Sequence, residues 1–551
     1  MRANCAIDFF PSSFTTRGPA LMGLQSANEG FLDGFICHAD VDALFAHTRT
    51  VEEFAAFRQA ASARSLPVHR IVPGDNPALA GAGALLHPFP GFGPLAWTRR
   101  FGDERAYSLL GITHTTATAA VMDSIGNLCI APIQPWDAVV CTSTAVRQTY
   151  ETVLDYWHDY LAARLGAVRF PRPMLPIIPL GVNTESFAST PAAQGARTRW
   201  RENNGIGESD IVVLWVGRFN HAAKAHPIPA YLALEAVARR VQCRIVYVQA
   251  GWFPNPQTER AFHDAARRCS PAVRHAFLDG RQPDVRAQVW HAADIFLSLS
   301  DNIQETFGLT PIEAMAAGLP VVVTDWDGYR DTVRVGIDGM RIPTTMPAKE
   351  AGGEVAQSFA AGGLSYDAYC GVTAETASID FDRCVEALVS LASNPELRRR
   401  MGEAGRRRAV EVYDWCRVIA AYHDLIEELG RIRAAAQAEP RGSNAPAFPL
   451  RADPYAVFAG YATNPLTPES VLYPAAFAAS LAVDAAAEHP LNSFAIPWLG
   501  GENRLRDLLA RIHASPGSKV RDLAGAGEPL SGSMLRAIGW LAKMGFIRVA
   551  S

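Results

Sequence analysis

Short apolar runs alternate with amphipathic helical patterns through roughly the first 420 residues. In the first part of the chain, the runs that predict strands are Cys5–Phe10, Gly34–His38, Ala138–Thr142 and Met174–Pro179, and the patterns that predict helices include Val51–Ala63 and Ala145–Leu165. Alternation of strand and helix is typical of a parallel sheet whose strands are joined by helical crossovers.

A second series of the same kind begins at Ile211–Val216. Its further predicted strands are Arg244–Gln249, Ile295–Leu299, Leu319–Thr324 and Met340–Ile342, and its predicted helices are Pro229–Val241, Glu259–Cys269, Pro311–Ala317 and Phe381–Ser393. Two such series predict an α/β protein with two doubly wound, Rossmann-like domains and a cleft between them.

The domain boundaries follow from these patterns. We expect a first Rossmann-like domain over residues 1–180 and a second over 181–432, with Pro179–Phe187 as the hinge and a helix at Glu411–Leu429 closing the second domain. Residues 433–450 are rich in Ala, Pro, Gly and Ser, which predicts a linker. Residues 451–551 then form a third, small and mainly helical domain.

This third domain resembles a winged-helix unit. Its patterns are a helix at Leu505–Ile512, a short element at Ser518–Ala524, a longer helix at Ser533–Lys543 and a strand at Phe546–Val549. Residues 441–551 contain ten Lys/Arg and eight Asp/Glu, so no basic face indicates DNA binding. We therefore favour a packing or dimerisation module that could form a homo-oligomer, and expect no nucleic-acid partner.

The bulk composition is that of an ordinary globular protein. Of the 551 residues, 49% are hydrophobic and 19% are charged, and the formal net charge is −4. The nine cysteines form no C-x-x-C pair and no zinc-like cluster, which favours a reduced, cytoplasmic protein. No signal-peptide pattern and no apolar run of about 18 residues is present, so only peripheral membrane contact stays open.

Two cations follow the first strand of the second series. That strand ends at Gly217, and Arg218 and Lys224 follow at the start of the next crossover. Because ligands of open parallel sheets lie beyond the carboxyl ends of the strands, Arg218 and Lys224 suit a diphosphate. Taken alone, they are more typical of surface charges on a loop.

Two glutamates follow the strand Ile295–Leu299. Glu305 lies in a polar loop, and Glu313 lies on the helix that we expect to begin at Thr310-Pro311. Backbone N–H groups of Thr306, Phe307, Gly308 and Leu309 would then form an anion site beside a helix N-terminus. Thr310 and Glu313 also fit a capping box, which would give Glu313 a structural role instead.

The order of these features resembles the retaining GT-B glycosyltransferases of family 4, the glycosyl transferases group 1. The resemblance rests on Gly217-Arg218 and Lys224, on Glu305 and Glu313 separated by seven residues, on Ala316-Ala-Gly-Leu-Pro-Val-Val, on Asp327-Gly, Asp331 and Asp338-Gly339, and on Pro179-Leu-Gly-Val-Asn at the hinge. It covers about residues 1–430, and its motifs are far more specific in the second half.

The resemblance implies a sugar transfer from a nucleoside diphosphate donor, with retention of configuration and without a metal or cofactor. Arg218 and Lys224 would bind the donor diphosphate, Glu305 the transferred sugar and Glu313 the ribose. Glycines at the donor would be Gly217 and Gly23, the latter closing the loop Gly18-Pro-Ala-Leu-Met-Gly. A histidine would face the sugar, for which His114 is favoured over His87. The acceptor would be a carbohydrate or a lipid-linked carbohydrate, as in surface-polysaccharide assembly.

Three alternatives remain at this point. Asp325-Trp-Asp327 has the D-x-D form that holds Mn²⁺ or Mg²⁺ in another glycosyltransferase fold, but we interpret it as part of a loop. A nucleotide-sugar epimerase would need a further acid/base set that we do not identify. A DNA-binding regulator with a degenerate transferase body would use the third domain for DNA and the first two to sense a nucleotide-sugar.

Overall fold

The computed structural model describes residues 3–15, 23–437, 446–475, 477–478, 481–524 and 530–550. The chain divides into two compact units, residues 1–443 and 444–551. Four clusters of buried apolar side chains lie in the first unit and one lies in the second. The predicted linker 433–450 lies partly outside the described residues.

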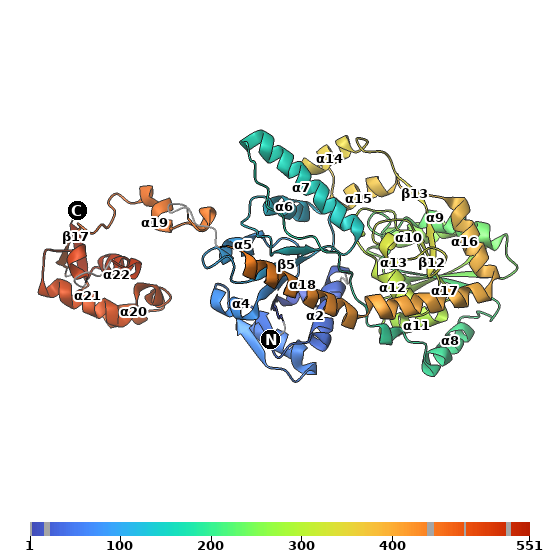
Figure 1. Cartoon of the computed structure of the whole chain (residues 1–551), viewed down its shortest axis with the longest axis horizontal. Helices are drawn as coiled ribbons and strands as arrows, with labels where there is room; N and C mark the ends of the chain where they lie inside the picture. Colours follow the sequence, from blue (N-terminus) through green and yellow to red (C-terminus); the bar gives the residue numbers. More distant parts are fainter. Residues whose placement is uncertain are drawn as a thin grey trace. The chain divides into compact units, whose positions relative to one another are not determined.

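The first unit begins with a six-stranded parallel sheet in the order β3-β2-β1-β4-β5-β6 (Figure 1). Its strands are β1 (Ala6–Asp8), β2 (Leu44–His47), β3 (Val68–Ile71), β4 (Ala84–His87), β5 (Ser108–Ile112) and β6 (Ala138–Val140). The accompanying helices are α1 (Pro11–Phe14), α2 (Gly23–His38), α3 (Val51–Ala60), α4 (Asn76–Ala82), α5 (Gly93–Arg99), α6 (Ala119–Leu128) and α7 (Thr144–Leu165).

Two strand predictions in this sheet are wrong. Gly34–His38 is the last turn and a half of α2, and its apolar residues are buried because that helix lies inside the first core. Met174–Pro179 makes only isolated bridges to β6 and the residue after it. Strands β2 to β5 were not predicted. Strands β2 to β4 are only four residues long and two of them end in histidine, so that no apolar run stands out there.

The second sheet is also parallel and six-stranded, in the order β12-β11-β10-β7-β8-β9. Its strands are β7 (Ile211–Val216), β8 (Ile245–Gly251), β9 (Arg274–Asp279), β10 (Ile295–Ser298), β11 (Val321–Thr324) and β12 (Gly339–Ile342). Around it lie α8 (Pro191–Asn203), α9 (Pro227–Ala238), α10 (Pro256–Cys269), α11 (Pro283–Ala292), α12 (Leu309–Ala316), α13 (Tyr329–Thr332), α14 (Gly353–Ala360), α15 (Tyr366–Ala374), α16 (Phe381–Ser393) and α17 (Pro395–Arg408), with a small hairpin of β13 (Thr344–Thr345) and β14 (Ser378–Ile379).

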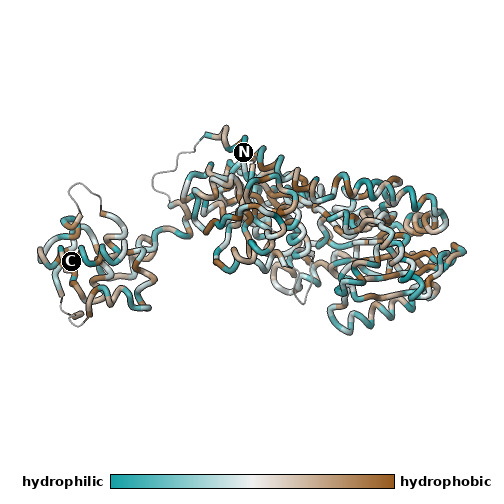
Figure 2. The backbone as a smooth tube through the Cα atoms, turned by 90° about the horizontal axis from the view of Figure 1, so that it is seen from below, coloured by the Kyte–Doolittle hydropathy of each residue, from teal (hydrophilic) through white to brown (hydrophobic). Residues whose placement is uncertain are grey.

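These two sheets confirm the predicted fold class of two Rossmann-like domains. Figure 2 shows apolar stretches running through the middle of both. Every strand of the second sheet except β9 was predicted. Strand β9 escaped prediction because it is an edge strand, mostly half-exposed, that begins with Arg-His and ends with Asp.

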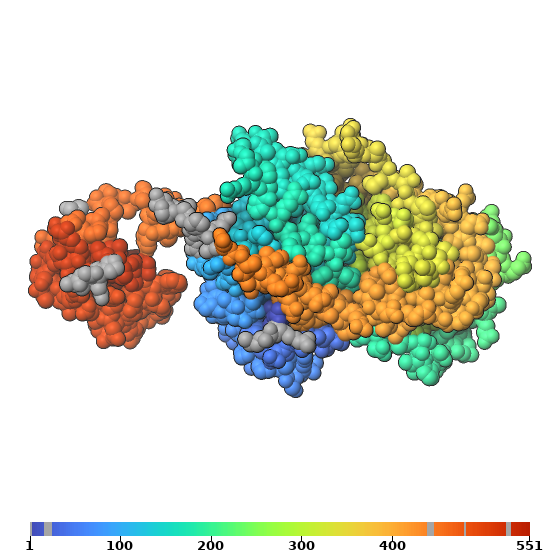
Figure 3. All heavy atoms as spheres, in the orientation of Figure 1, coloured from blue at the N-terminus to red at the C-terminus, as the bar shows by residue number. Residues whose placement is uncertain are grey.

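The helix expected to close the second domain belongs instead to the core of the first. After a short π-helical segment at Ala409–Tyr413, α18 (Trp415–Ala435) packs along α2. Its buried side chains Trp415, Val418, Ile419, Tyr422, Leu425, Ile426 and Leu429 all lie in the first core. In Figure 3 this orange stretch runs without a break from the second sheet domain onto the first.

The predicted hinge is therefore one of two chain crossings that lie side by side. The N–H of Val182 donates to the carbonyl oxygen of Tyr413 at 2.8 Å, and the N–H of Trp415 donates back to Val182 at 3.3 Å. The Trp415 indole fills a space that only glycines leave open. A Cβ atom at Gly34 or Gly181 would come within 2.7 Å or 2.5 Å of its ring.

The second unit has a core of its own around a three-stranded antiparallel sheet, in the order β16-β15-β17. Its elements are α19 (Pro454–Val457), β15 (Val471–Pro474), α20 (Val483–Glu488), α21 (Glu502–Ala514), β16 (Ser518–Lys519), a 3₁₀ turn at Val520–Leu523, α22 (Gly532–Lys543) and β17 (Ile547–Ala550). The helix, short helix, longer helix and strand occur in the predicted order. The central strand β15 was not predicted, and the winged-helix resemblance stays a prediction.

Candidate active site

Two cations lie beyond the carboxyl end of β7, as the sequence predicts. Arg218 is half-buried, and its guanidinium makes no hydrogen bond or ion pair with any residue that the structure describes. The ammonium of Lys224 lies 3.5 Å from the Glu305 carboxylate, with the two side chains 30% and 15% exposed. The structure thus brings Lys224 and Glu305 together, 81 positions apart in the chain.

The loop after β10 presents a run of unpaired backbone donors. The side-chain oxygen of Asn302 accepts the N–H groups of Gln304 and Glu305 at 3.0 and 3.2 Å. The next four N–H groups, those of residues 306–309, have no acceptor among the described residues. Consecutive free N–H groups at a helix N-terminus form an anion site.

Helix α12 does not use Glu313 as a cap. It begins at Leu309, two residues before the predicted start at Pro311, and its N-cap is Gly308 in the left-handed region with φ of 85°. Glycine is required there also because a Cβ atom would lie 2.0 Å from the Tyr329 ring. No side chain caps this helix, so the capping-box interpretation of Thr310 and Glu313 is wrong.

Glu313 is instead a half-buried carboxyl group that has no hydrogen-bond or ion-pair partner among the described side chains. Its burial raises its pKa from the ordinary 4.5 to about 7. A carboxyl group that is partly desolvated without a partner is a feature more typical of a binding site than of a stabilising contact.

His114 lies where the two sheet domains meet. Its Nε2 lies 3.0 Å from the carbonyl oxygen of Pro88, which makes Nε2 the protonated nitrogen. Its carbonyl oxygen accepts a hydrogen bond from the Thr306 hydroxyl at 2.5 Å. Burial lowers the pKa of His114 to about 4, so the ring is neutral, and Nδ1 is buried without a partner.

Three acids near the loop were not assigned a site role from the sequence. Asp301 accepts the N–H of His226 at 3.1 Å, and burial raises its pKa to about 7. Asp331 accepts the N–H of Thr144, the first residue of α7, at 2.6 Å. Asp327 lies 3.4 Å from the Ser143 hydroxyl. The last two contacts join the second sheet domain to the first.

The side chains of Asp325 and Asp327, the two acids of the D-x-D sequence, do not face a common site. Asp325 lies 3.3 Å from Arg341, whereas Asp327 faces Ser143. Among the residues that the structure describes, no three His, Cys, Asp or Glu side chains are grouped so as to hold a metal ion.

A second polar cluster lies at the carboxyl edge of the first sheet. The buried Asp8 carboxylate, at the end of β1, accepts hydrogen bonds from Nδ1 of His47 at 2.8 Å and Nδ1 of His87 at 2.7 Å. Arg49 adds a contact at 3.3 Å. These donors outweigh the burial of Asp8 and hold its pKa well below the usual range. Of this cluster the sequence analysis names only His87, as a competitor of His114.

Aromatic rings connect this cluster with His114. The Phe89 ring lies 5.7 Å from that of His87 and 6.5 Å from that of His114. Of the predicted glycine-rich loop, Gly23 is the first residue of α2, and residues 16–22 lie outside the described residues. Gly217 lies against β8, where a Cβ atom on Gly251 would meet its carbonyl oxygen.

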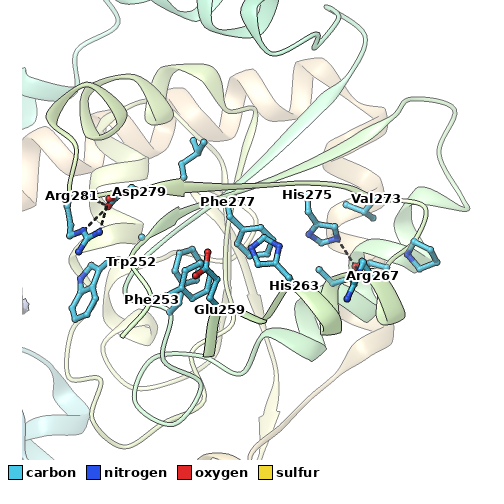
Figure 4. A pocket seen from close by; sticks show the side chains of 16 residues that line it. Trp252, Phe253, Glu259, His263, Arg267, Val273, His275, Phe277, Asp279 and Arg281 are labelled. Carbon is cyan, nitrogen blue, oxygen red and sulfur yellow. Dashed lines mark hydrogen bonds and ion pairs between the residues drawn. The ribbon is translucent and has the colours of Figure 1, made fainter. Parts of the chain in front are cut away.

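A cavity of 910 Å³ lies elsewhere in the second sheet domain, between α10 and the edge strand β9 (Figure 4). Its walls carry aromatic rings, among them Phe253, Phe277 and His263. One end, at Trp252 and Arg281, lies at the carboxyl ends of β8 and β9, on the same edge of the sheet as Arg218. The rest is lined mainly by residues of α10 and β9, and also by Phe219, which follows Arg218.

Two Rossmann-like domains with an anion site of this kind have the architecture of the GT-B class of glycosyltransferases. Residues 196–357, which lie in the second sheet domain, match the family model described as "Glycosyl transferases group 1". The expected resemblance is confirmed for this part of the chain.

Two curated relatives are similar over about half of the chain. The D-inositol 3-phosphate glycosyltransferase of Geodermatophilus obscurus is 28% identical over 295 residues, which are 51% of this chain and 53% of the relative. The phosphatidyl-myo-inositol mannosyltransferase of Mycobacterium leprae is 27% identical over 288 residues, which are 50% of this chain and 61% of the relative. The chain thus spans little more than half the length of these relatives.

Among solved structures, that of Anabaena HepE in complex with UDP and glucose is 13% identical, with a TM-score of 0.49, over 77% of this chain and 100% of that chain. In the part of the chain that the structure describes, no helix has the length and apolar character needed to span a membrane.

Proposed function

We propose that the protein transfers a sugar from a nucleoside diphosphate donor to an acceptor held by the first sheet domain, with retention of the anomeric configuration. The observation that carries this proposal is the run of four free N–H groups at residues 306–309. Arg218 and Lys224 supply cations at the same edge of the sheet. Together they suit the diphosphate of a donor.

The chemical work of these groups is to stabilise the departing diphosphate. Charge develops on the leaving group as the bond to the sugar breaks, and fixed donors around it lower the barrier. The Glu305 carboxylate holds Lys224 in place before the donor arrives. The Arg218 guanidinium keeps its hydrogen-bonding capacity for a phosphate oxygen.

Glu313 would accept hydrogen bonds from the ribose hydroxyls. Its carboxylate has no competing partner among the described residues. Glu313 lies on α12, the helix that follows the loop after β10, residues 299–308, which we call the phosphate loop. Two adjacent hydroxyls are a good match for one ionised carboxylate, which accepts hydrogen bonds at both oxygens. Donor binding and the ionisation of Glu313 should therefore be linked.

His114 would serve the transferred sugar as a neutral ring. Because Nε2 donates to Pro88, the buried Nδ1 is a hydrogen-bond acceptor with nothing to accept. A sugar hydroxyl would satisfy it. Its low pKa excludes a role as a protonated general acid near neutral pH.

The acceptor would bind at the cluster of Asp8, His47 and His87. Because the Asp8 carboxylate accepts hydrogen bonds from Nδ1 of both histidines, their Nε2 atoms are available to a ligand. The two relatives are named for phosphorylated inositols, and Arg49, whose side chain is 46% exposed, would meet an acceptor phosphate beside this cluster. We accordingly propose a polyol acceptor that carries a phosphate, free or lipid-linked.

Calorimetric titration with UDP, GDP and ADP, followed by their hexose conjugates, tests the donor half of this proposal. One nucleotide should bind to the wild type, and Arg218→Ala and Lys224→Ala should weaken it by about ten-fold or more each. Arg268→Ala, on the exposed face of α10, is the matched control and should bind as the wild type does. If none of the three nucleotides binds, the proposal fails.

The anomeric configuration of the product, followed by proton NMR from the start of the reaction, tests retention. A product of inverted configuration would contradict that part of the proposal. Assays with and without EDTA test the metal-free mechanism, for which equal rates are expected.

A further inference from the structure

Asp327 has a backbone conformation that its side chain does not favour. Its φ is +42°, and Glu350 is the only other non-glycine residue with a positive φ among those described. The left-handed region costs an L-residue roughly 1 kcal/mol, although Asp tolerates it better than most residues. Glycine would adopt it without cost.

The strained segment is clamped onto the phosphate loop. Gly328 lies so close to Phe307 that a Cβ atom would be 2.5 Å from its Cα. The indole N–H of Trp326 donates to the carbonyl oxygen of Asn302 at 2.9 Å. Asp327 is thus fixed, between these two contacts, beside the loop that carries Glu305.

The carboxyl group of Asp327 makes few stabilising contacts with the protein. One oxygen makes a long contact of 3.4 Å with the Ser143 hydroxyl, and the other is buried without any partner. Burial and the neighbouring Glu305 raise its pKa to about 8. Backbone strain together with a buried, unsatisfied oxygen marks a functional position, because neither helps the fold.

We propose that Asp327 is a second sugar-binding carboxyl group, which works beside Glu305 and selects a neutral, hydroxyl-rich donor sugar over one that carries a carboxylate. This inference rests on the proposed function and deepens it. The unpartnered oxygen of Asp327 binds a sugar hydroxyl. Above pH 8, where Asp327 is ionised, a uronate group in place of the hydroxyl would meet two carboxylates, of which only that of Glu305 is paired with a cation.

Substitution by glycine separates this role from a structural one. Asp327→Gly removes the strain and the orphaned oxygen, so its melting temperature should not fall below that of the wild type. Its affinity for the bare nucleoside diphosphate should stay within about two-fold. Its affinity for the corresponding nucleotide-hexose should fall by about ten-fold, the effect of one lost hydrogen bond to an acid.

Glu350→Gly is the matched control, since it relieves a positive φ at an exposed position. It should share the unchanged melting temperature and bind the nucleotide-hexose as the wild type does. Asp327→Asn, which keeps the shape of the side chain, should lower the affinity for the nucleotide-hexose less than Asp327→Gly does. The probes are UDP-glucose, GDP-mannose or ADP-glucose, according to the base that the wild type binds, and the uronate of the same nucleotide.

The inference is overturned if Asp327→Gly binds the nucleotide-hexose as tightly as the wild type does. It is likewise overturned if the affinity of Asp327→Gly for the bare nucleotide falls as much as its affinity for the nucleotide-hexose. It is also overturned if its melting temperature drops by several degrees, or if above pH 8, where Asp327 is ionised, the wild type binds the uronate as well as the hexose. A wild type that binds no nucleotide at all overturns the proposed function and this inference together, whereas nucleotide binding with unaffected variants overturns the inference alone.

Discussion

The ammonium of Lys224 lies 3.5 Å from the carboxylate of Glu305 and ties the first crossover of the second sheet domain to its phosphate loop. Partly exposed pairs of this kind contribute only about 0–1 kcal/mol to stability. We therefore predict that Lys224→Ala and Glu305→Gln lose about 100-fold or more in transfer rate while the melting temperature moves by no more than about 2 °C. Steady-state kinetics and differential scanning calorimetry check this.

Another pair of opposite charges serves as the control for these variants. Arg240 and Glu386 lie 2.9 Å apart on the surface of the same domain. Arg240→Ala should change neither rate nor melting temperature appreciably. A loss of stability in Lys224→Ala that matched its loss of activity would show that the pair is structural.

Glu313 makes stability depend on pH in a direction opposite to that of an ordinary surface glutamate. Its pKa is higher in the folded protein, about 7, than in the unfolded chain, near 4.5, so folding favours its protonated form. Its contribution to stability is therefore present below pH 4.5 and lost as the pH rises towards 7. We predict that at pH 8 the free energy of unfolding of Glu313→Gln is about 1–3 kcal/mol higher than that of the wild type. At pH 4.5 the two proteins should be equally stable.

Calorimetric melting curves at the two pH values measure this difference. Glu396→Gln is the control, because Glu396 is exposed and its pKa is lowered by Arg399. The same Glu313→Gln protein should bind the nucleotide more weakly at pH 8. If the nucleotide affinity is unchanged, Glu313 is not part of the donor site.

The Asp8 carboxylate should stabilise the first sheet domain, and most strongly at neutral pH. Its pKa is depressed in the folded protein by His47 and His87, so its contribution is present above pH 3.8 and is lost as the pH falls. We predict that Asp8→Asn lowers the free energy of unfolding by about 3 kcal/mol at pH 7, and by less as the pH falls below 4. Urea denaturation at a series of pH values checks this.

His87→Gln tests the acceptor role of the same cluster. Of the ring's hydrogen-bonding groups, the glutamine amide can replace only one. We expect the KM for the acceptor to rise about ten-fold while the affinity for the nucleotide is unchanged. Arg105→Ala, a half-buried position of this domain paired with Asp103, is the control. An equal loss of nucleotide affinity in His87→Gln would place the histidine at the donor instead.

The Trp415 indole and Gly34 are packed so closely that no side chain fits at the glycine. A methyl group there would overlap three ring atoms at 2.7–2.9 Å. Gly34→Ala should therefore cost about 1–3 kcal/mol despite its better helix propensity. Gly430→Ala, in α18 with no atom within 4 Å of the added methyl, is the matched control and should be stabilising by about 0.5–1 kcal/mol. Urea denaturation of both variants compares the two, and equal behaviour would contradict the packing.

The second sheet domain could be predicted from the sequence in more detail than the first, for a physical reason. Its strands β7, β10 and β11 are buried on both faces, so each is a continuous apolar run that stands out from its surroundings. In the first domain, strands such as β2 and β3 contain His or Arg, β3 is also partly exposed, and the apolar run that resembled a strand is buried helix.

The same contrast holds for the candidate site. Lys224 and Glu305 could be placed together only through the family resemblance, since nothing in their own spacing indicates contact. Asp8 and His47 were missed because single polar residues at strand ends carry no spacing pattern. Only the strand order β2-β1-β4 makes them neighbours. A search for ionisable residues within predicted strands would have found Asp8 in Cys5–Phe10, but not its partners.

Helix α18 has a consequence for the order in which the chain can fold during synthesis. The first sheet is complete at Val140, yet its core stays open until residues 415–429 have been made, because their apolar side chains close it. The second sheet domain, by contrast, is built from one continuous stretch of chain. The middle of the protein can therefore fold first on the ribosome, while the earlier-made domain waits with an apolar face uncovered and exposed to aggregation or to chaperones.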